Sequence, residues 1–263
     1  MKTFKQNTKK EALNMRKYFY PEGHPHICKR KEDLDPTQPG LLRNSKKEIK
    51  CKKIGEANEH EKFIKLSEKF PSAKIYYNIY FETGYFNSKL NIYQTVQIGF
   101  ILVFPNAVIV IEVKHLSDDV YTELSGSPRT KTWRLKTSTG KKRTFTNGCA
   151  QNYMHHQFLK QLLEYNSIDV PIHRITVLGG ISEDKVKCTG YIDDNLILED
   201  DLIEKINSLL KKNKAKIDVD KVCNTIDSWT CTTEGREILH IVLIKCCKKN
   251  CLPKRCKGKL RKL

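Results

Sequence analysis

Apolar positions along the chain predict helices that alternate with β-strands. Between Gly55 and Phe70, apolar residues recur every three or four positions, which is the period of one helix face, and Pro71 ends the pattern. The run Ile75–Phe81 is aromatic and β-branched and predicts a strand. Gly84–Asn91, which follows, is typical of a loop or turn.

Two hairpins are predicted in the middle of the chain. The apolar runs Tyr93–Phe104 and Ala107–Lys114 are joined at Pro105-Asn106, which predicts a pair of long strands buried on at least one face. Lys131–Lys136 and Arg143–Phe145 flank a short turn and predict a second, more exposed hairpin.

The rest of the chain completes a mixed fold. A helix is expected over Cys149–Tyr165, a buried strand over Ile172–Leu178 and a helix over Asp200–Leu210. Val186–Tyr191 is a further candidate strand, and residues 218–247 are expected to be helical in two pieces. This order of elements predicts an α/β (α+β) fold with a central mixed β-sheet flanked by helices.

The distribution of charge adds to this picture. The net charge is +18, and residues 1–53 hold 15 lysines and arginines against six acids. Residues 245–263 hold nine and no acid, whereas 54–244 hold 24 of each. Basic segments flanking a neutral globule indicate a polyanionic partner such as nucleic acid, although they could also be solubilising tails.

Composition and pattern together divide the chain into four parts. Residues 1–50 are expected to be a basic, poorly ordered arm, 51–180 the core, 181–245 a helical extension and 246–263 a basic, cysteine-rich tail. The sequence contains no run of about 18 apolar residues, so no membrane-spanning helix is predicted. The first residues lack the apolar centre of a signal peptide, so we expect a cytoplasmic protein with mostly reduced cysteines.

Candidate chemistry lies at the end of an apolar strand. Glu112 and Lys114 are two residues apart, so their side chains point to the same face of a strand. Burying either charge alone is costly, so the two should be paired, bound to a metal or placed at an open rim. A structural ion pair at a strand end is the alternative interpretation.

Several ordered motifs surround this pair. They are Gly55-Glu56-Ala57-Asn58-Glu59, Gln97-Ile98-Gly99, Ile111-Glu112-Val113-Lys114, Asn147-Gly148-Cys149-Ala150-Gln151 and the strand Pro171–Val177. Together they resemble the nuclease-related domain (NERD) of the PD-(D/E)xK nuclease superfamily, over roughly residues 55–180. The resemblance implies a restriction-endonuclease-like core.

The resemblance also implies roles for individual residues. Glu112 would be a metal ligand and Lys114 the catalytic lysine, with Glu59 and Gln151 as supporting polar groups. Such a site would use Mg²⁺ or Mn²⁺ to hydrolyse phosphodiesters, with DNA as the expected partner.

One position departs from the family. Its metal-binding aspartate falls on Gly99, and glycine offers no ligand. Asp118 or Asp119 could reach in from the loop after Lys114, although the pattern does not indicate it. The departure predicts impaired or lost cleavage, or a protein that binds nucleic acid without cutting it.

Two further segments bear on ligands. The second hairpin carries basic residues and no acid between positions 129 and 143, so it could grip phosphates, although an exposed lysine-rich hairpin would look the same. The C-terminal Cys246-Cys247, Cys251 and Cys256 resemble half of a zinc ribbon, but their spacing argues against zinc. The basic candidates are Arg129, Lys131, Arg134, Lys136, Lys141, Lys142 and Arg143.

Overall fold

A computed structural model describes residues 46–87, 92–127, 130–188 and 195–230. By its contacts the chain divides into two units. The larger unit, Cys51–Ile79 with Ile98–Ser228, contains all the elements discussed below in connection with the site. In the other unit, Phe81 and Thr230 form an isolated antiparallel bridge.

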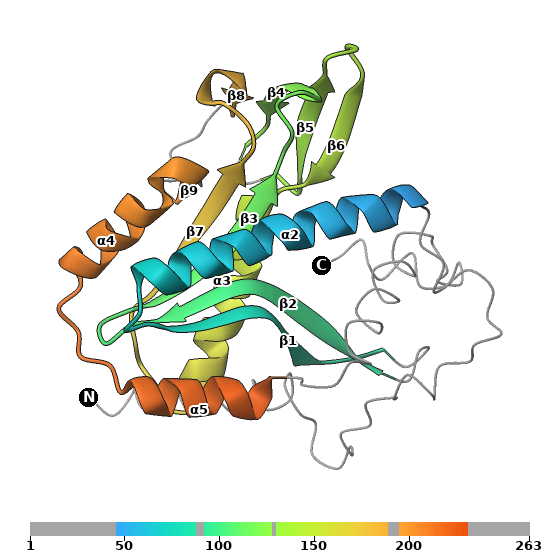
Figure 1. Cartoon of the computed structure of the whole chain (residues 1–263). Coiled ribbons are helices and arrows are strands. Elements are labelled where there is room, and N and C mark those ends of the chain that lie inside the picture. The colour runs from blue at the N-terminus through green and yellow to red at the C-terminus, as the bar shows by residue number, and fades with distance from the viewer. Residues whose placement is uncertain (1–45, 88–91, 128–129, 189–194, 231–263) are drawn as a thin grey trace. The chain divides into compact units, whose positions relative to one another are not determined.

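Helices and strands alternate as the apolar pattern predicts (Figure 1). The elements are α2 (Lys46–Lys69), β1 (Lys74–Asn87), β2 (Ile92–Val103), β3 (Val108–His115), β4 (Tyr121–Ser125), β5 (Thr132–Thr137), β6 (Lys142–Thr146), α3 (Gly148–Tyr165), β7 (Ile172–Gly179), η2 (Glu183–Lys185), β8 (Val186–Lys187), β9 (Leu196–Leu198), η3 (Glu199–Asp201), α4 (Leu202–Lys212) and α5 (Val219–Trp229).

Five strands form the central sheet, in the order β1-β2-β3-β7-β9. The hairpin β2–β3 is antiparallel, whereas β7 runs parallel to both β3 and β9. The sheet is therefore mixed, and β3 and β7 place their carboxyl ends at the same edge. The predicted fold class, a central mixed sheet flanked by helices, is confirmed.

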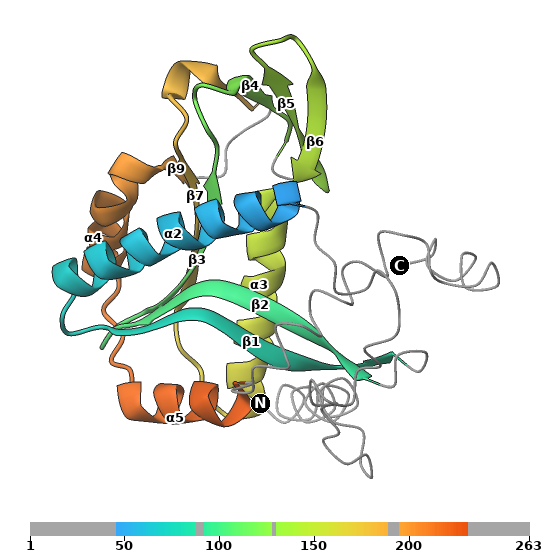
Figure 2. The ribbon, with the colours of Figure 1, turned by 45° about the vertical axis from the view of Figure 1, so that its right-hand side comes forward.

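Helices α2 and α4 cover one face of this sheet (Figures 1 and 2). Their apolar side chains pack on alternate residues of β2, β3 and β7, because successive strand residues point to opposite faces. The buried cluster comprises Leu66, Phe70, Phe100, Leu102, Phe104, Ile109, Ile111, Val113, Ile175, Val177, Leu202 and Ile206.

Helix α3 covers the opposite face, as the view in Figure 2 shows. Asn152 of α3 is fully buried and donates to the carbonyl of Ile175 at 2.7 Å and to Oγ1 of Thr176 at 3.3 Å. The strand residues that do not point towards α2 point towards α3, and among them are Glu112 and Lys114 of β3. The charged pair therefore lies on the α3 side of the sheet.

A small second sheet follows β3, in the order β6-β5-β4-β8. It lies beyond the carboxyl ends of β3 and β7 (Figure 1). Its inner side packs on residues of α3, β7 and β9 through Trp133, which is fully buried. The other buried members of this cluster are Leu116, Leu124, Leu135, Cys149, Leu178, Ile181 and Leu196.

Some predicted boundaries were wrong. Gly84–Asn91 was predicted as a loop, but β1 continues through Asn87, because pairing with β2 outweighs the local preference of glycine. Helix α2 begins at Lys46 rather than at Gly55. Strands β4 and β9 were not predicted.

Other predictions lie outside the described residues. These are the arm before Lys46, the second helical piece after Thr230 and the cysteine-rich tail. Within the described part of the chain, no helix is long and apolar enough to cross a membrane.

Candidate functional site

Glu112 and Lys114 form a close ion pair on the α3 side of β3. Nζ of Lys114 lies 2.6 Å from Oε1 of Glu112. The Glu112 side chain is 8% exposed, whereas that of Lys114 is 21% exposed. The carboxylate is therefore held inside the fold, while the Lys114 side chain is partly exposed.

Helix α3 supplies a partner to each charge. Oε1 of Gln151 accepts a hydrogen bond from Nζ of Lys114 at 2.9 Å. Nδ1 of His155 lies 3.4 Å from Oε2 of Glu112. The predicted association of Glu112, Lys114 and Gln151 is thus present in the structure, and His155 joins it.

His155 was missed by the sequence interpretation. It follows Gln151 by four residues, which places both side chains on one face of a helix. It is also buried, at 4% exposed. Helical spacing from Gln151 was therefore the signal that could have revealed it.

The environment of Glu112 favours its charged form. Burial by itself raises the pKa of a carboxyl group, but the charge of Lys114 and the contact with His155 outweigh burial. The result is a pKa lowered from 4.5 to about 2. Glu112 is therefore a carboxylate at neutral pH.

Gly99 and Glu112 lie just beyond the last pair of the β2–β3 hairpin. In its register Phe100 pairs with Ile111 and Ile101 with Val110. Phe100 and Ile111 pack on the α2 side, so alternation turns position 99 and Glu112 to the opposite, α3 side of the sheet. A Cβ on Gly99 would meet the carbonyl oxygen of Ile111 at 3.3 Å, a tight contact that needs a small shift. A side chain at position 99 would therefore face the same site.

The start of α3 is built around the same site. Asn147 caps the helix, because its Oδ1 accepts from the backbone N–H of Cys149 at 2.9 Å. A Cβ on Gly148, the next residue, would lie 2.9 Å from Cγ of Lys114 and 3.0 Å from Cγ2 of Thr176. Glycine at position 148 therefore leaves room for the stem of Lys114.

Two other acidic candidates come from α2 and from the loop after β3. Glu59 is on α2, one turn before Lys62, and its side chain is partly buried. Its role as a supporting group stays a prediction. Asp118 is exposed and holds the neighbouring loop, accepting from the backbone N–H of Ser182 at 3.0 Å and pairing with Lys185 at 3.2 Å. These contacts give Asp118 a structural role between its own loop and the segment after β7.

The basic hairpin is present as β5 and β6. Its six described candidates are exposed, and Arg129 lies outside the described residues. Trp133, which sits among them in sequence, points into the core instead. The exposed candidates are Lys131, Arg134, Lys136, Lys141, Lys142 and Arg143.

The donor set does not fit a Mg²⁺ site. Such a site needs several oxygen ligands, with carboxylates foremost. Glu112 provides one carboxylate, and both of its oxygens already face Lys114 and His155. Gly99 contributes none. Among the described residues, no group of three His, Cys, Asp or Glu side chains could hold a metal ion.

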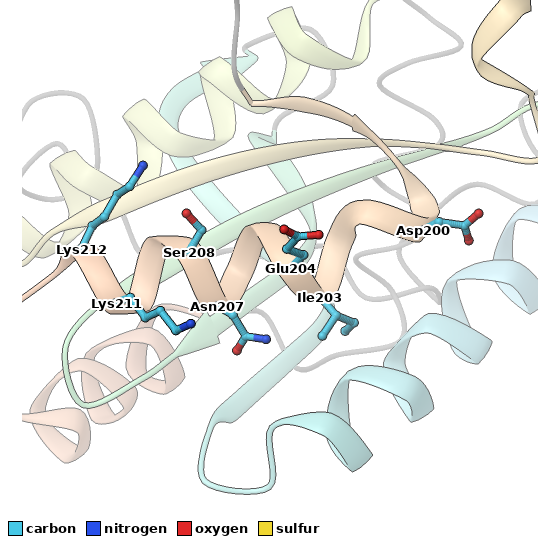
Figure 3. A pocket seen from close by; sticks show the side chains of 7 residues that line it. All are labelled: Asp200, Ile203, Glu204, Asn207, Ser208, Lys211 and Lys212. Atoms are coloured by element: carbon cyan, nitrogen blue, oxygen red, sulfur yellow. The ribbon is translucent and has the colours of Figure 1, made fainter.

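A surface hollow along α4 is separate from this site. It has a volume of about 670 Å³ and is open to solvent. Figure 3 shows that its lining side chains project from α4 and the turn η3 before it. They are Asp200, Ile203, Glu204, Asn207, Ser208, Lys211 and Lys212. None of the charged pair's neighbours lines this hollow, so it carries no part of the candidate chemistry.

A mixed sheet with a Glu-x-Lys pair on β3 and a glutamine on the following helix defines a nuclease-like domain. Residues 52–179 match the family model of the nuclease-related domain, NERD. This part of the chain is therefore a nuclease-related domain. No curated protein and no solved structure matches the chain.

Proposed function

We propose that the protein binds DNA through its nuclease-related domain, and that metal-dependent phosphodiester hydrolysis by this domain is impaired or lost. One observation carries the proposal. Gly99, just beyond the last β2–β3 pair and on the same side of the sheet as Glu112, stands where the family resemblance places an aspartate. A site with one carboxylate, already engaged by Lys114, lacks the donors that a divalent ion needs.

The remaining residues suit binding of a phosphate. Lys114 presents a partly exposed ammonium group whose position is fixed by Glu112 and Gln151. A fixed cation of this kind can stabilise the negative charge of a phosphate oxygen. Nδ1 of His155, on the buried side, lies 3.4 Å from the second oxygen of Glu112.

A non-catalytic nucleic-acid-binding protein on the same scaffold is the second candidate. The ion pair favours it, because Glu112 is held by Lys114 and His155 rather than left open for a ligand. The two candidates differ only in residual cleavage, so one assay separates them.

Cleavage of supercoiled and linear DNA with Mg²⁺ or Mn²⁺ tests the proposal. The panel is the unchanged chain, Gly99→Asp, Lys114→Ala and the double variant. We expect Gly99→Asp to cut at least about 100-fold faster than the unchanged chain, since it restores a carboxylate facing Glu112. We expect Lys114→Ala to remove that gain in the double variant.

Two results would overturn the proposal. If the unchanged chain cuts as fast as Gly99→Asp and Lys114→Ala abolishes the activity, the site works without its aspartate and another acid serves. If the unchanged chain fails to bind DNA at low salt, then DNA is not its partner. Slow cleavage by the unchanged chain that Gly99→Asp accelerates supports impaired activity. No cleavage by the unchanged chain supports the non-catalytic candidate.

A further inference from the structure

The outer side of the small sheet is exposed, in contrast to its inner side. Along β5 the side chains alternate between exposed and buried, with Trp133 and Leu135 facing the core. Their neighbours Arg134 and Lys136 therefore point outwards. On β6, Phe145 contacts Trp133 on the inner side, which leaves Lys142 outside with Arg134 and Lys136.

A fourth cation joins this surface from a distant part of the sequence. Strand β8 pairs in parallel with β4, so that Lys187 lies beside Ser125. Ser125 is in turn paired with Arg134 on β5. Lys187 and Arg134 thus flank one residue on the same outer side, about 10 Å apart across two strand spacings. We call the surface formed by Arg134, Lys136, Lys142 and Lys187 the basic face.

The charges of the basic face are largely uncompensated. All four side chains are exposed. No ion pair within the described part of the chain uses any of them, whereas Lys62 pairs with Glu199 and Lys185 with Asp118. Glu123 lies opposite Lys136 in the β4–β5 register. Among the described strands it is the one acidic residue that is a cross-strand neighbour of any of the four cations. A net positive face of this kind attracts a polyanion.

The basic face is joined to the candidate site through Asn147. Its Nδ2 donates to the backbone carbonyl of Ser127 at 2.9 Å and also to that of Thr130, just before β5. Its Oδ1 caps α3, which carries Gln151 and His155. The small sheet is therefore fixed relative to the start of the helix that builds the site.

We infer that the basic face contacts the phosphate backbone of duplex DNA, and this inference rests on the proposed function above. The face offers cations, serine and threonine, while the aromatic rings of Trp133 and Phe145 point inwards. Cations and hydroxyls contact phosphate groups, and such contacts do not by themselves recognise the base sequence. Binding through this face is thus independent of base sequence.

Salt-dependent binding of a labelled DNA duplex, measured by fluorescence anisotropy, tests the inference. The test variant replaces Arg134, Lys136, Lys142 and Lys187 with glutamine. The matched control loses the same charge at four exposed lysines, two in the last turn of α4 and two just after it. Those lysines are Lys211, Lys212, Lys214 and Lys216. Because each phosphate contact contributes about 0.9 to the slope of log K against log salt, the test variant should lose about 3.6 and the control less than about 1.

Folding is checked by thermal unfolding, and Lys187→Gln alone provides a milder variant. It should lower the slope by about 0.9 while Lys212→Gln leaves the slope unchanged. Equal losses in the test variant and the control would overturn the inference, because only net charge would then matter. Duplex RNA binding more than about tenfold tighter than DNA would overturn the assignment to DNA.

The outcome also separates this inference from the proposed function. If the unchanged chain binds DNA, Gly99→Asp cuts it and the quadruple glutamine variant binds with an unaltered slope, the basic face alone is refuted. If the unchanged chain binds no DNA at low salt, the proposed function fails and the inference fails with it.

Discussion

The cost of burying the Glu112 carboxylate is offset by the interactions of this carboxylate with its neighbours. Burial disfavours the Glu112 carboxylate, yet Lys114 at 2.6 Å and His155 at 3.4 Å keep it charged. Removing one partner from such a pair leaves an uncompensated charge, which costs more stability than the intact pair contributes. The pair is therefore a structural unit as well as candidate chemistry.

This balance predicts a pH dependence of stability. The pKa of Glu112 is lowered from 4.5 to about 2, so its contribution is present above about pH 4.5 and is lost as the pH falls towards 2. Glu112→Gln should lower the free energy of unfolding by on the order of 3 kcal/mol near neutral pH, and the difference should shrink on acidification. Urea unfolding between pH 3 and 7 measures it.

An exposed glutamate provides the control for this prediction. Glu204→Gln on α4 removes the same charge from the surface and should leave the pH dependence nearly unchanged. If Glu112→Gln and Glu204→Gln gave parallel curves, the carboxylate of Glu112 would not be stabilised by its surroundings.

The sequence predicted part of this residue-scale picture. A carboxylate and an ammonium two residues apart on an apolar strand required a partner, and the structure provides one. The contact with His155 joins residues 43 positions apart, and it depends on the packing of α3 against β3. The spacing of His155 from Gln151 could place it on the same helix face, but only this packing brings it to Glu112.

At the scale of elements, the α3 N-terminus connects the two sheets. Asn147 is fully buried and uses both ends of its amide. The oxygen caps α3, and the nitrogen binds the segment that leads into β5. Buried amides with both ends satisfied fix the position of the groups they join.

Substitution of Asn147 separates these two contacts. Asn147→Asp keeps the capping oxygen but loses both donor bonds, so it should cost about 1–3 kcal/mol. Asn147→Ala also loses the cap and should cost about 1 kcal/mol more. Chemical unfolding of the two variants measures the difference. Equal costs would mean that the cap contributes nothing beyond the link to the small sheet.

Elements with strong local patterns were predicted correctly. The β2–β3 hairpin combines long apolar runs with a Pro-Asn turn, and both features are visible in sequence. Strands β8 and β9 have two and three residues, and each is defined by the strand beside it. Val186–Tyr191 was a candidate strand, but its partner β4 was not predicted, which is why the place of Lys187 on the basic face could not be predicted.

At the scale of the whole molecule, the NERD family match covers residues 52–179. The net charge of +18 arises in segments at both ends of the sequence that lie largely outside the described residues. The neutral middle nevertheless concentrates exposed cations on the basic face of the small sheet. A segment with no net charge can therefore still form a local positive surface, because the fold brings cations from separate strands together.

The central claim is that Gly99 leaves the carboxylate of Glu112 without the second acid that a divalent ion requires. Calorimetric titration with Mn²⁺ tests it directly, using the unchanged chain, Gly99→Asp and Gly99→Asp combined with Glu112→Gln. We predict that Gly99→Asp binds Mn²⁺ at least about tenfold more tightly than the unchanged chain, and that Glu112→Gln removes this gain. Equally tight binding by the unchanged chain and Gly99→Asp would contradict the claim, because the ion would then be held by other residues.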